Sequence, residues 1–106
     1  MVRATFSEPE NEVYLSVISV WEINIKYQLG KLSLPVQPDQ FIPRQRQDHL
    51  ITSLELTEAD TLHLTNLPDL HKDPFDRMLV CQAIEQALTI LTPDPLIRRY
   101  PIRTLW

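Results

Sequence analysis

Three acidic residues of this sequence follow apolar or strand-like segments. Glu22 comes after an expected strand over residues 12–16, Asp76 lies at the mouth of an expected apolar helix, and Asp94 comes after an expected strand over residues 89–92. Strands of a parallel sheet end at one edge, and ligands bind there. Carboxylates that converge repel one another unless a cation lies between them. The pattern therefore predicts a site for a hard cation, with Glu22, Asp76 and Asp94 as its ligands.

The same acids also have a purely structural explanation. Negative charge near a helix N-terminus is stabilised by the helix dipole and by free backbone N–H groups. The segment 57–60 has the spacing of such a helix cap, and we assign no chemistry to it. A loop, and not an obvious strand, precedes the helix of Asp76. Each acid alone is more simply explained as a cap, and only the combination of three favours a functional site.

Residues around these acids are weaker candidates. Asp73 is most simply a helix N-cap, and His71 is either a contact to metal or phosphate or a surface hydrogen-bonding residue. Arg77 either holds phosphate or pairs with Asp76, and the sequence favours neither. Asp73, Arg77 and His71 are therefore kept as candidate contacts to substrate. The histidines and the cysteine have no metal-ligand spacing, so zinc is not expected.

Two other residue types are interpreted as structural. Ser19 has no histidine base near it in the sequence, which argues against a serine hydrolase. Trp21 and Trp106 are interpreted as core residues and not as platforms for stacked bases. Cys81 lies among apolar residues, which predicts a buried structural thiol.

Length and composition predict one soluble domain over residues 1–106. The chain is 43% hydrophobic and 23% charged, with a formal net charge of -4. This charge argues against binding nucleic acid through a basic surface, but not against a nuclease that reaches phosphate through metal ions. No apolar run approaches the roughly 20 residues of a membrane span, and the first residues lack the apolar core of a signal peptide. We therefore expect a cytoplasmic protein with no membrane partner.

Hydrophobic periodicity predicts strands that alternate with helices. Expected strands cover residues 12–16, 51–56 and 89–92, with a last one within 100–106. Expected helices have their N-caps at Ser19, at Thr57 and at Asp73, which Pro74 follows, and a polar helix covers 39–49. This alternation predicts an α/β fold with a mostly parallel sheet flanked by helices.

Two helix details complete this prediction. Gly30, the single glycine, is expected to cap the first helix, in which Glu22 and Lys26 form an i,i+4 pair. The helix that begins at Asp73 is expected to expose one polar face, made of positions 82, 85, 86 and 89. Its expected buried face consists of Phe75, Leu79, Ala83, Ala87 and Leu88.

Nearly the whole chain, over residues 13–106, resembles the PIN-domain ribonucleases, in particular the VapC-like toxins of bacterial toxin–antitoxin systems. The resemblance is sharpest in residues 16–32, which contain the Trp21-Glu22 pair, in residues 67–83, and in residues 91–106. The resemblance implies a parallel sheet between helices and hydrolysis of RNA phosphodiester bonds with Mg²⁺ or Mn²⁺. It matches the family acids to Glu22, Asp76 and, less firmly, Asp94. It also implies RNA, a cognate antitoxin and a second copy of the chain as partners.

The family opens with a strand that carries its first acidic ligand and then a helix, and nothing here matches that opening. Residues 1–11 are interpreted as the tail of the second family helix. A strand, a helix, part of another and their turns amount to roughly 30 residues. We therefore expect an N-terminally truncated family member whose catalytic activity is in doubt. The alternatives are a non-catalytic remnant that binds an antitoxin or dimerises, and an unrelated α/β binding module whose acids are all caps.

Overall fold

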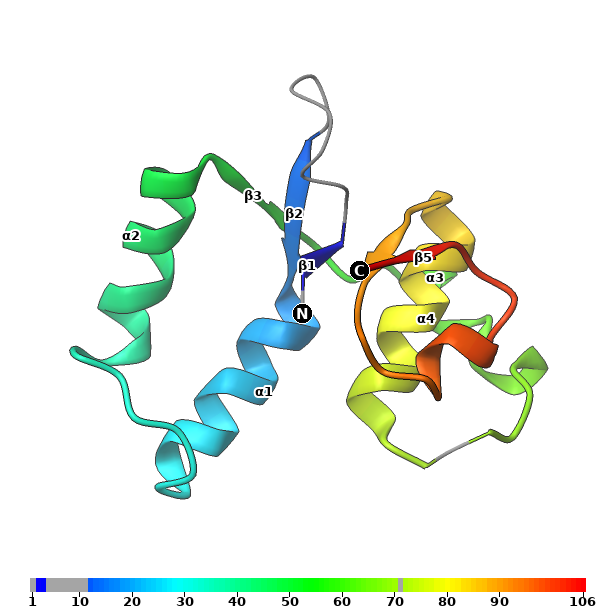
Figure 1. The fold of residues 1–106 in the computed structure, drawn as a ribbon, viewed down its shortest axis with the longest axis horizontal. Helices are drawn as coiled ribbons and strands as arrows, with labels where there is room; N and C mark the ends of the chain where they lie inside the picture. The colour runs from blue at the N-terminus through cyan, green and yellow to red at the C-terminus, as the bar shows by residue number, and fades with distance from the viewer. Residues whose placement is uncertain (1, 4–11, 71) are drawn as a thin grey trace.

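The computed structural model of this chain describes residues 2–3, 12–70 and 72–106 (Figure 1). The elements in chain order are β1 (Val2–Arg3), β2 (Val13–Ser16), α1 (Val17–Gln28), α2 (Pro38–His49), β3 (Ile51–Leu54), α3 (Glu58–Thr61), the 3₁₀ helix η1 (Leu64–Asn66), α4 (Pro74–Gln86), β4 (Ile90–Leu91), the 3₁₀ helix η2 (Ile97–Arg99) and β5 (Thr104–Leu105). The fold is α/β, as the alternation of patterns predicts. None of the described helices is long and apolar enough to cross a membrane.

The described strands form two small sheets and not the one sheet expected, but the expected parallel pairing is present in both. The first sheet has the order β1-β2-β3 and the second pairs β4 with β5. Strands β2 and β3 are parallel, with Val13 opposite Ile51 and Ser16 opposite Leu54. Strands β4 and β5 are also parallel. Strand β1 lies near β4, but no described strand joins the two sheets by hydrogen bonds.

Strand β1 also corrects the interpretation of residues 1–11 as the tail of a helix. Its two residues are extended and pair antiparallel with Tyr14 and Leu15 of β2. The rest of that interpretation falls on residues 1 and 4–11, which lie outside the described residues.

Helix α1 begins three residues earlier than the sequence indicates. Its N-cap is Ser16 and not Ser19, because Ser16 is extended and its hydroxyl accepts the N–H of Ile18. Strand β2 therefore passes directly into α1 without a loop. The predicted end is confirmed: Gly30 has a φ of 72°, and Lys31 N–H donates to the carbonyl of Lys26. This pattern is a Schellman cap, in which glycine takes the left-handed position without steric cost.

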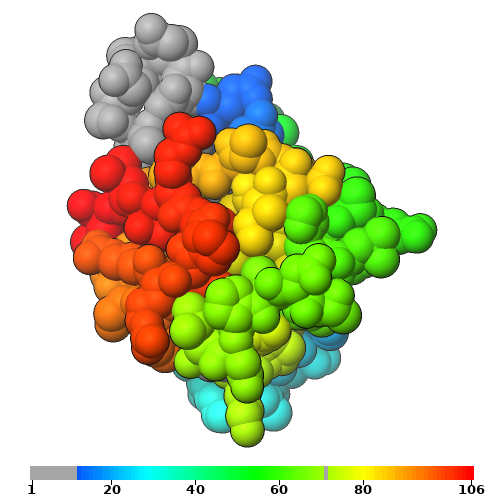
Figure 2. Space-filling model, turned by 90° about the vertical axis from the view of Figure 1, so that its right-hand side faces the viewer, coloured from blue at the N-terminus to red at the C-terminus, as the bar shows by residue number. Residues whose placement is uncertain are grey.

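Helix α4 is the centre of the molecule, and its predicted start is confirmed. Asp73 is the N-cap and Pro74 the first helical residue. The α4 helix, α1, β4 and η2 bury a core that consists of Ile18, Leu79, Val80, Ala83, Ile90, Ile97 and Tyr100. The space-filling view shows the C-terminal segment on one side of α4 and the α3–η1 segment on the other (Figure 2). Helix α4 is thus packed on several sides at once.

Because α4 is surrounded, Gln82 is completely buried, and its assignment to an exposed face is wrong. The side-chain oxygen of Gln82 accepts a hydrogen bond from the Ser16 hydroxyl at 2.5 Å. Its amide nitrogen donates to the backbone carbonyl of Glu55 at 3.1 Å. Gln82 therefore links the β2–α1 junction, the segment after β3, and α4. On the expected buried face Leu79 and Ala83 are buried, but Ala87 is exposed.

Asp60, the acid at the end of segment 57–60, has a structural role, as expected. Thr57 and Asp60 form a reciprocal capping box at the start of α3. Both carboxylate oxygens of the fully buried Asp60 also lie 3.1 Å from the amide nitrogen of Gln86. The Thr57 N–H binds this carboxylate within the cap, and Gln86 binds it from α4, which holds α3 against α4. Cys81 is buried too, which confirms the expected structural thiol.

Candidate active site

A cavity of about 380 Å³ opens between α1 and the start of α4. It is lined by Glu22, Ile25, Lys26, Leu29, Lys31, Asp73, Pro74 and Phe75. Two carboxylates and two ammonium groups thus border one concave space whose remaining walls are apolar. The N-terminus of α4 adds partial positive charge at the side where Asp73 lies.

Glu22 reaches this cavity from the second turn of α1. Because α1 begins at Val17, Glu22 is not part of a helix start, which corrects its interpretation as a capping acid. Its oxygen Oε2 lies 3.3 Å from Nζ of Lys26, and its side chain is 22% exposed. The predicted i,i+4 pair is therefore present. Lys26 holds one oxygen of the carboxylate and balances part of its charge.

Asp73 reaches the same cavity as the N-cap of α4. Its oxygen Oδ1 accepts the backbone N–H groups of Phe75 at 2.9 Å and Asp76 at 3.2 Å. These bonds hold the carboxylate in place, and among the described residues none is formed to Oδ2. Asp73 can therefore present one oxygen to a ligand while it caps the helix. The sequence favoured Asp76 over Asp73 as the functional acid.

Asp76 is the third residue of α4 and is half-buried in its first turn. It is not among the residues that line the cavity. Its neighbour Phe75 lines the cavity and contacts Trp21, the residue before Glu22. The start of α4 therefore contacts the second turn of α1, but the predicted proximity of Glu22 and Asp76 stays a prediction.

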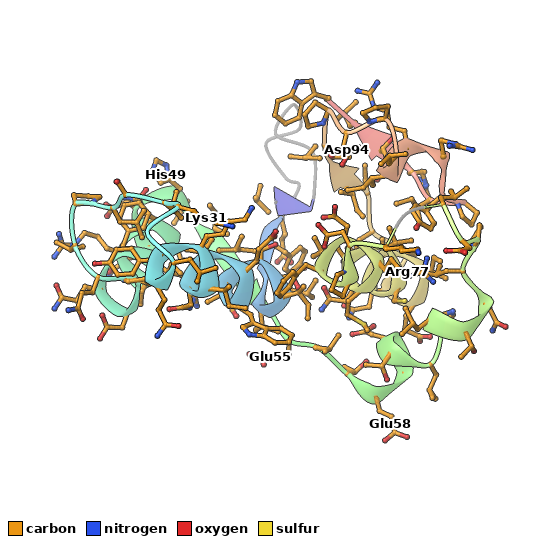
Figure 3. The ribbon with its side chains drawn as sticks, turned by 90° about the horizontal axis from the view of Figure 1, so that it is seen from below. Lys31, His49, Glu55, Glu58, Arg77 and Asp94 are labelled. Atoms are coloured by element: carbon orange, nitrogen blue, oxygen red, sulfur yellow. The ribbon has the colours of Figure 1, made fainter. Side chains whose placement is uncertain are left out.

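Asp94 lies in the turn that follows β4. Its N–H donates to Oγ1 of the buried Thr92 at 3.0 Å, and its Oδ1 accepts the N–H of Leu96 at 2.9 Å. In Figure 3 Asp94 lies on the β4–β5 side of the molecule, whereas Lys31 lies on the side of α1 and α2. The described contacts of Asp94 therefore shape a turn, and its role as a ligand stays a prediction.

The residues of the described ranges offer two carboxylates at one cavity, but no group of three metal-binding side chains. No cluster of three His, Cys, Asp or Glu residues that could hold a metal occurs among residues 12–70 and 72–106. Mg²⁺ in proteins often takes only one or two carboxylates and completes its shell with water and substrate phosphate. Glu22 and Asp73 fit this kind of site, but the described residues do not form an all-protein cage.

Arg77 has structural partners in the described chain. Its Nη1 donates to the backbone carbonyl of Pro68 at 3.1 Å and to the Tyr100 hydroxyl at 3.3 Å. Arg77 thus fastens the loop before α4 to the C-terminal segment. Its expected roles, a contact to phosphate or a pair with Asp76, stay predictions. His71 lies outside the described residues.

Trp21 contradicts its interpretation as a core residue, because it is 58% exposed. Its ring packs against Phe75 edge to face, with 5.0 Å between ring centroids and 77° between ring planes. Trp106, the other expected core tryptophan, is 76% exposed. The exposure of Trp21 beside Glu22 and the presence of Lys31 at the cavity were missed by sequence reasoning. The adjacency of Trp21 and Glu22 in the chain was the available signal.

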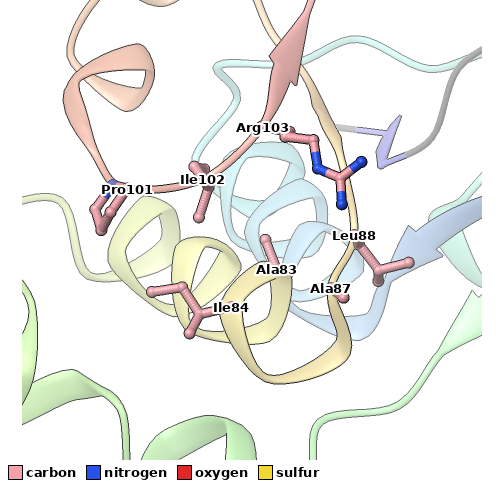
Figure 4. Close-up of a pocket in the computed structure, with 7 residues that line it drawn as sticks. All are labelled: Ala83, Ile84, Ala87, Leu88, Pro101, Ile102 and Arg103. Atoms are coloured by element: carbon pink, nitrogen blue, oxygen red, sulfur yellow. The ribbon is translucent and has the colours of Figure 1, made fainter.

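A second cavity of about 380 Å³ lies between the end of α4 and the segment before β5 (Figure 4). Its described lining consists of Ala83, Ile84, Ala87, Leu88, Pro101, Ile102 and Arg103. This lining has a single charged group, the guanidinium of Arg103, and lacks an acid or a nucleophile. The cavity therefore offers no acid–base or metal chemistry, and the candidate active site is the one between α1 and α4.

Cys81 is not a nucleophile of either cavity. Burial raises the pKa of its thiol, and the positive charge of Arg77 opposes this effect only in part. A thiol with a raised pKa stays protonated at neutral pH, and the protonated form is a poor nucleophile.

Comparison with known proteins gives one partial match. Over 61 residues, which are 58% of this chain, the sequence is 34% identical to "Ribonuclease VapC16" of Mycobacterium tuberculosis (strain ATCC 25618 / H37Rv). The matched region is 43% of that protein, so the chain spans less than half the length of this relative. No family model matches the chain, and no solved structure matches it. The chain is therefore similar to a VapC ribonuclease over somewhat more than half of its own length.

Proposed function

We propose that this chain is a single PIN-like domain of the VapC toxin type, which hydrolyses RNA phosphodiester bonds with the help of Mg²⁺ or Mn²⁺. The observation that carries the proposal is the cavity between α1 and α4. Glu22 and Asp73 line this cavity together with Lys26 and Lys31. The partial match to a VapC ribonuclease supports the same assignment. Carboxylates for a metal and ammonium groups for phosphate are the groups that phosphodiester chemistry requires.

Each residue has a proposed role. Glu22, Asp76 and Asp94 are the proposed metal ligands from the sequence, and the cavity adds Asp73 to that set. A bound divalent ion would lower the pKa of a water and stabilise the charge that develops on the leaving oxygen. Lys26 orients the Glu22 carboxylate, because its ammonium group pairs with Oε2. The proposed ligand of the metal is the second oxygen, Oε1. Lys31, which is exposed at the rim, is placed to attract the phosphate.

The partners and the setting of the chain belong to the same proposal. RNA is the substrate, a cognate antitoxin is the regulator, and a second copy of the chain is a further partner. The proposed location is the cytoplasm, where an RNA target would be available.

One observation favours a second candidate function. Because the described residues form no cluster of three metal-binding side chains, the chain can also be a non-catalytic remnant that binds an antitoxin or dimerises. The two functions differ in one measurable property, which is RNA cleavage that depends on a divalent metal.

The test is cleavage of an end-labelled single-stranded RNA by the purified chain, with Mg²⁺ or Mn²⁺ and with EDTA. We expect cleavage that EDTA abolishes. Loss of a residue that only supports a metal ligand typically lowers activity about 10- to 100-fold. Glu22→Gln and Asp76→Asn each remove a proposed ligand, so each should reduce RNA cleavage by more than that. Glu58→Gln is the matched control, because Glu58 is an exposed acid in the first turn of α3.

Circular dichroism of every variant separates loss of function from loss of fold. Cleavage that survives EDTA and both site substitutions would contradict the proposal. A folded chain that cleaves no RNA with either metal would favour the non-catalytic candidate.

A further inference from the structure

Trp21 has an unusual position for the largest apolar side chain. It is 58% exposed, although it lies on α1 next to the half-buried Glu22. One contact with Phe75 fixes its ring edge to face, and such aromatic pairs prefer this geometry. More than half of its surface is open to solvent. The ring is therefore held in place and at the same time available to a ligand.

Trp21 borders a third, smaller hollow. This apolar pocket has a volume of about 160 Å³ and is lined by Ile18, Trp21, Leu56, Pro74, Phe75 and Met78. None of these lining residues carries a charge. An apolar pocket with an aromatic wall favours a flat, weakly polar ring over a charged or strongly hydrated group.

The apolar pocket and the candidate active site are neighbours. Pro74 and Phe75 line both spaces. The consecutive residues Trp21 and Glu22 place the aromatic wall of one next to the carboxylate of the other. One side therefore offers acids and ammonium groups, and the other offers an aromatic surface without charge. A nucleotide has the same division, with a charged phosphate and a flat base.

We propose that the apolar pocket binds an unpaired nucleobase of the RNA, stacked on Trp21, while the neighbouring phosphate lies at the cavity of Glu22 and Asp73. This inference rests on the proposed ribonuclease function and names the part of the substrate that the site holds. Stacking on aromatic side chains is how proteins bind single-stranded RNA with little dependence on sequence. The adjacency of the charged cavity favours a nucleotide over a protein side chain as the occupant.

The test uses the fluorescence of Trp21 in a Trp106→Phe background, which leaves Trp21 as the single tryptophan. The probes are a single-stranded adenosine hexanucleotide and an abasic ribose-phosphate hexamer of the same charge, both titrated in EDTA to prevent cleavage. We expect the base-bearing probe to quench Trp21 and the abasic probe to leave it unchanged. Trp21→Ala should weaken binding of the adenosine probe by about 5- to 150-fold, the range that corresponds to ~1–3 kcal/mol per stacked base.

Trp21→Phe is the conservative variant and should keep most of the affinity, because a phenyl ring still offers a face. Binding of that probe by Trp21→Ala and Trp21→Phe is followed by fluorescence anisotropy of a labelled probe, with circular dichroism melting as the control of fold. Equal binding of the adenosine and abasic probes would overturn the inference. So would an affinity for the adenosine probe that Trp21→Ala leaves unchanged in a folded protein.

Two outcomes distinguish this inference from the proposed function. Base-dependent quenching without any metal-dependent cleavage would uphold the pocket and refute the ribonuclease. Cleavage that is indifferent to Trp21→Ala would uphold the ribonuclease and refute the pocket. Trp21 fluorescence that responds to protein concentration but not to RNA would show that a second copy covers the pocket, and would also overturn the inference.

Discussion

Replacement of Gln82 by leucine is the sharpest test of how the fold positions the candidate site. Gln82 is completely buried and accepts a hydrogen bond from the Ser16 hydroxyl while it donates one to the Glu55 carbonyl. Leucine has a similar size and leaves little cavity, but it removes both partners. The Ser16 hydroxyl then loses its acceptor in a fully buried environment, whereas the carbonyl of Glu55 loses its donor in a part-buried one.

The magnitude follows from these two environments. A buried polar group without a partner costs about 1–3 kcal/mol, and a part-buried one costs less. We therefore expect Gln82→Leu to lower the free energy of unfolding by about 2–4 kcal/mol, from the typical total of about 5–15 kcal/mol. The midpoint of thermal unfolding should fall by about 4–8 °C for each kcal/mol lost.

The assay is urea unfolding followed by circular dichroism, with Gln47→Leu as the matched control. Gln47 is exposed on α2, and its replacement should change the stability by no more than about 0.5 kcal/mol. The double variant Ser16→Ala with Gln82→Leu should lose less stability than the sum of the single variants, because the orphaned hydroxyl is gone. An unchanged stability of Gln82→Leu, or strict additivity in the double variant, would refute this reasoning.

Three further predictions concern caps and the buried thiol. Asp73→Ala should lower the free energy of unfolding by about 0.5–2 kcal/mol, because two N–H groups of α4 lose their acceptor. Asp73→Asn keeps an acceptor, so urea unfolding should show near-native stability while metal-dependent cleavage falls; equal loss in both variants would contradict the double role. Gly30→Ala should destabilise by about 1 kcal/mol, because the φ of 72° is strained for a residue with a Cβ even where space is open. Cys81 should react with a thiol reagent at pH 8 much more slowly in the native than in the unfolded chain, because burial raises the pKa of its thiol. The native state then retains the thiol proton of Cys81 to a higher pH than the unfolded state. The stability that the protonated thiol provides is therefore complete below the unfolded pKa of Cys81, and it is lost as the pH rises from that pKa through the native one. If the native chain is labelled as fast as a free thiol, Cys81 is accessible to the reagent and the prediction is refuted.

Signals that act over a few residues were interpreted correctly from the sequence. Thr57 caps α3, Asp73 and Pro74 start α4, and Gly30 ends α1 as expected. A cap depends on a side chain and on backbone groups two or three residues away, so its partners are fixed by the local sequence. The Glu22–Lys26 pair belongs to the same class, because one turn of helix brings the two residues together.

The start of α1 shows the limit of such local signals. Both Ser16 and Ser19 precede apolar helical residues and can act as caps. Pairing of Ser16 with Leu54 at the end of β2 holds it in the extended conformation that an N-cap needs. That pairing joins residues far apart in the chain, so the choice between the two serines could not be made locally. Because α1 begins at Val17, Glu22 lies in its second turn and lines the cavity, and it is not the capping acid that the sequence indicated.

Sheet organisation also depends on distant pairing. The alternation of strands and helices predicts an α/β fold, and the described chain has that class. The same alternation does not state which strands are neighbours. Strands β2 and β4 belong to separate sheets, and β1 pairs antiparallel with β2. Strand neighbours are chosen by the packing of side chains across the whole domain.

The sequence by itself determined the N-caps of α3 and α4, the end of α1, the α/β class and which acids are candidates for chemistry. Only the tertiary structure decided that Gln82 is buried, that Trp21 is exposed, and that Asp73 and Glu22 border one cavity. Periodicity assigns a residue to a face of its own helix, but burial depends on what packs against that face. Helix α4 is covered on several sides and buries a polar residue that finds hydrogen-bond partners, whereas the outer part of α1 leaves an indole in solvent.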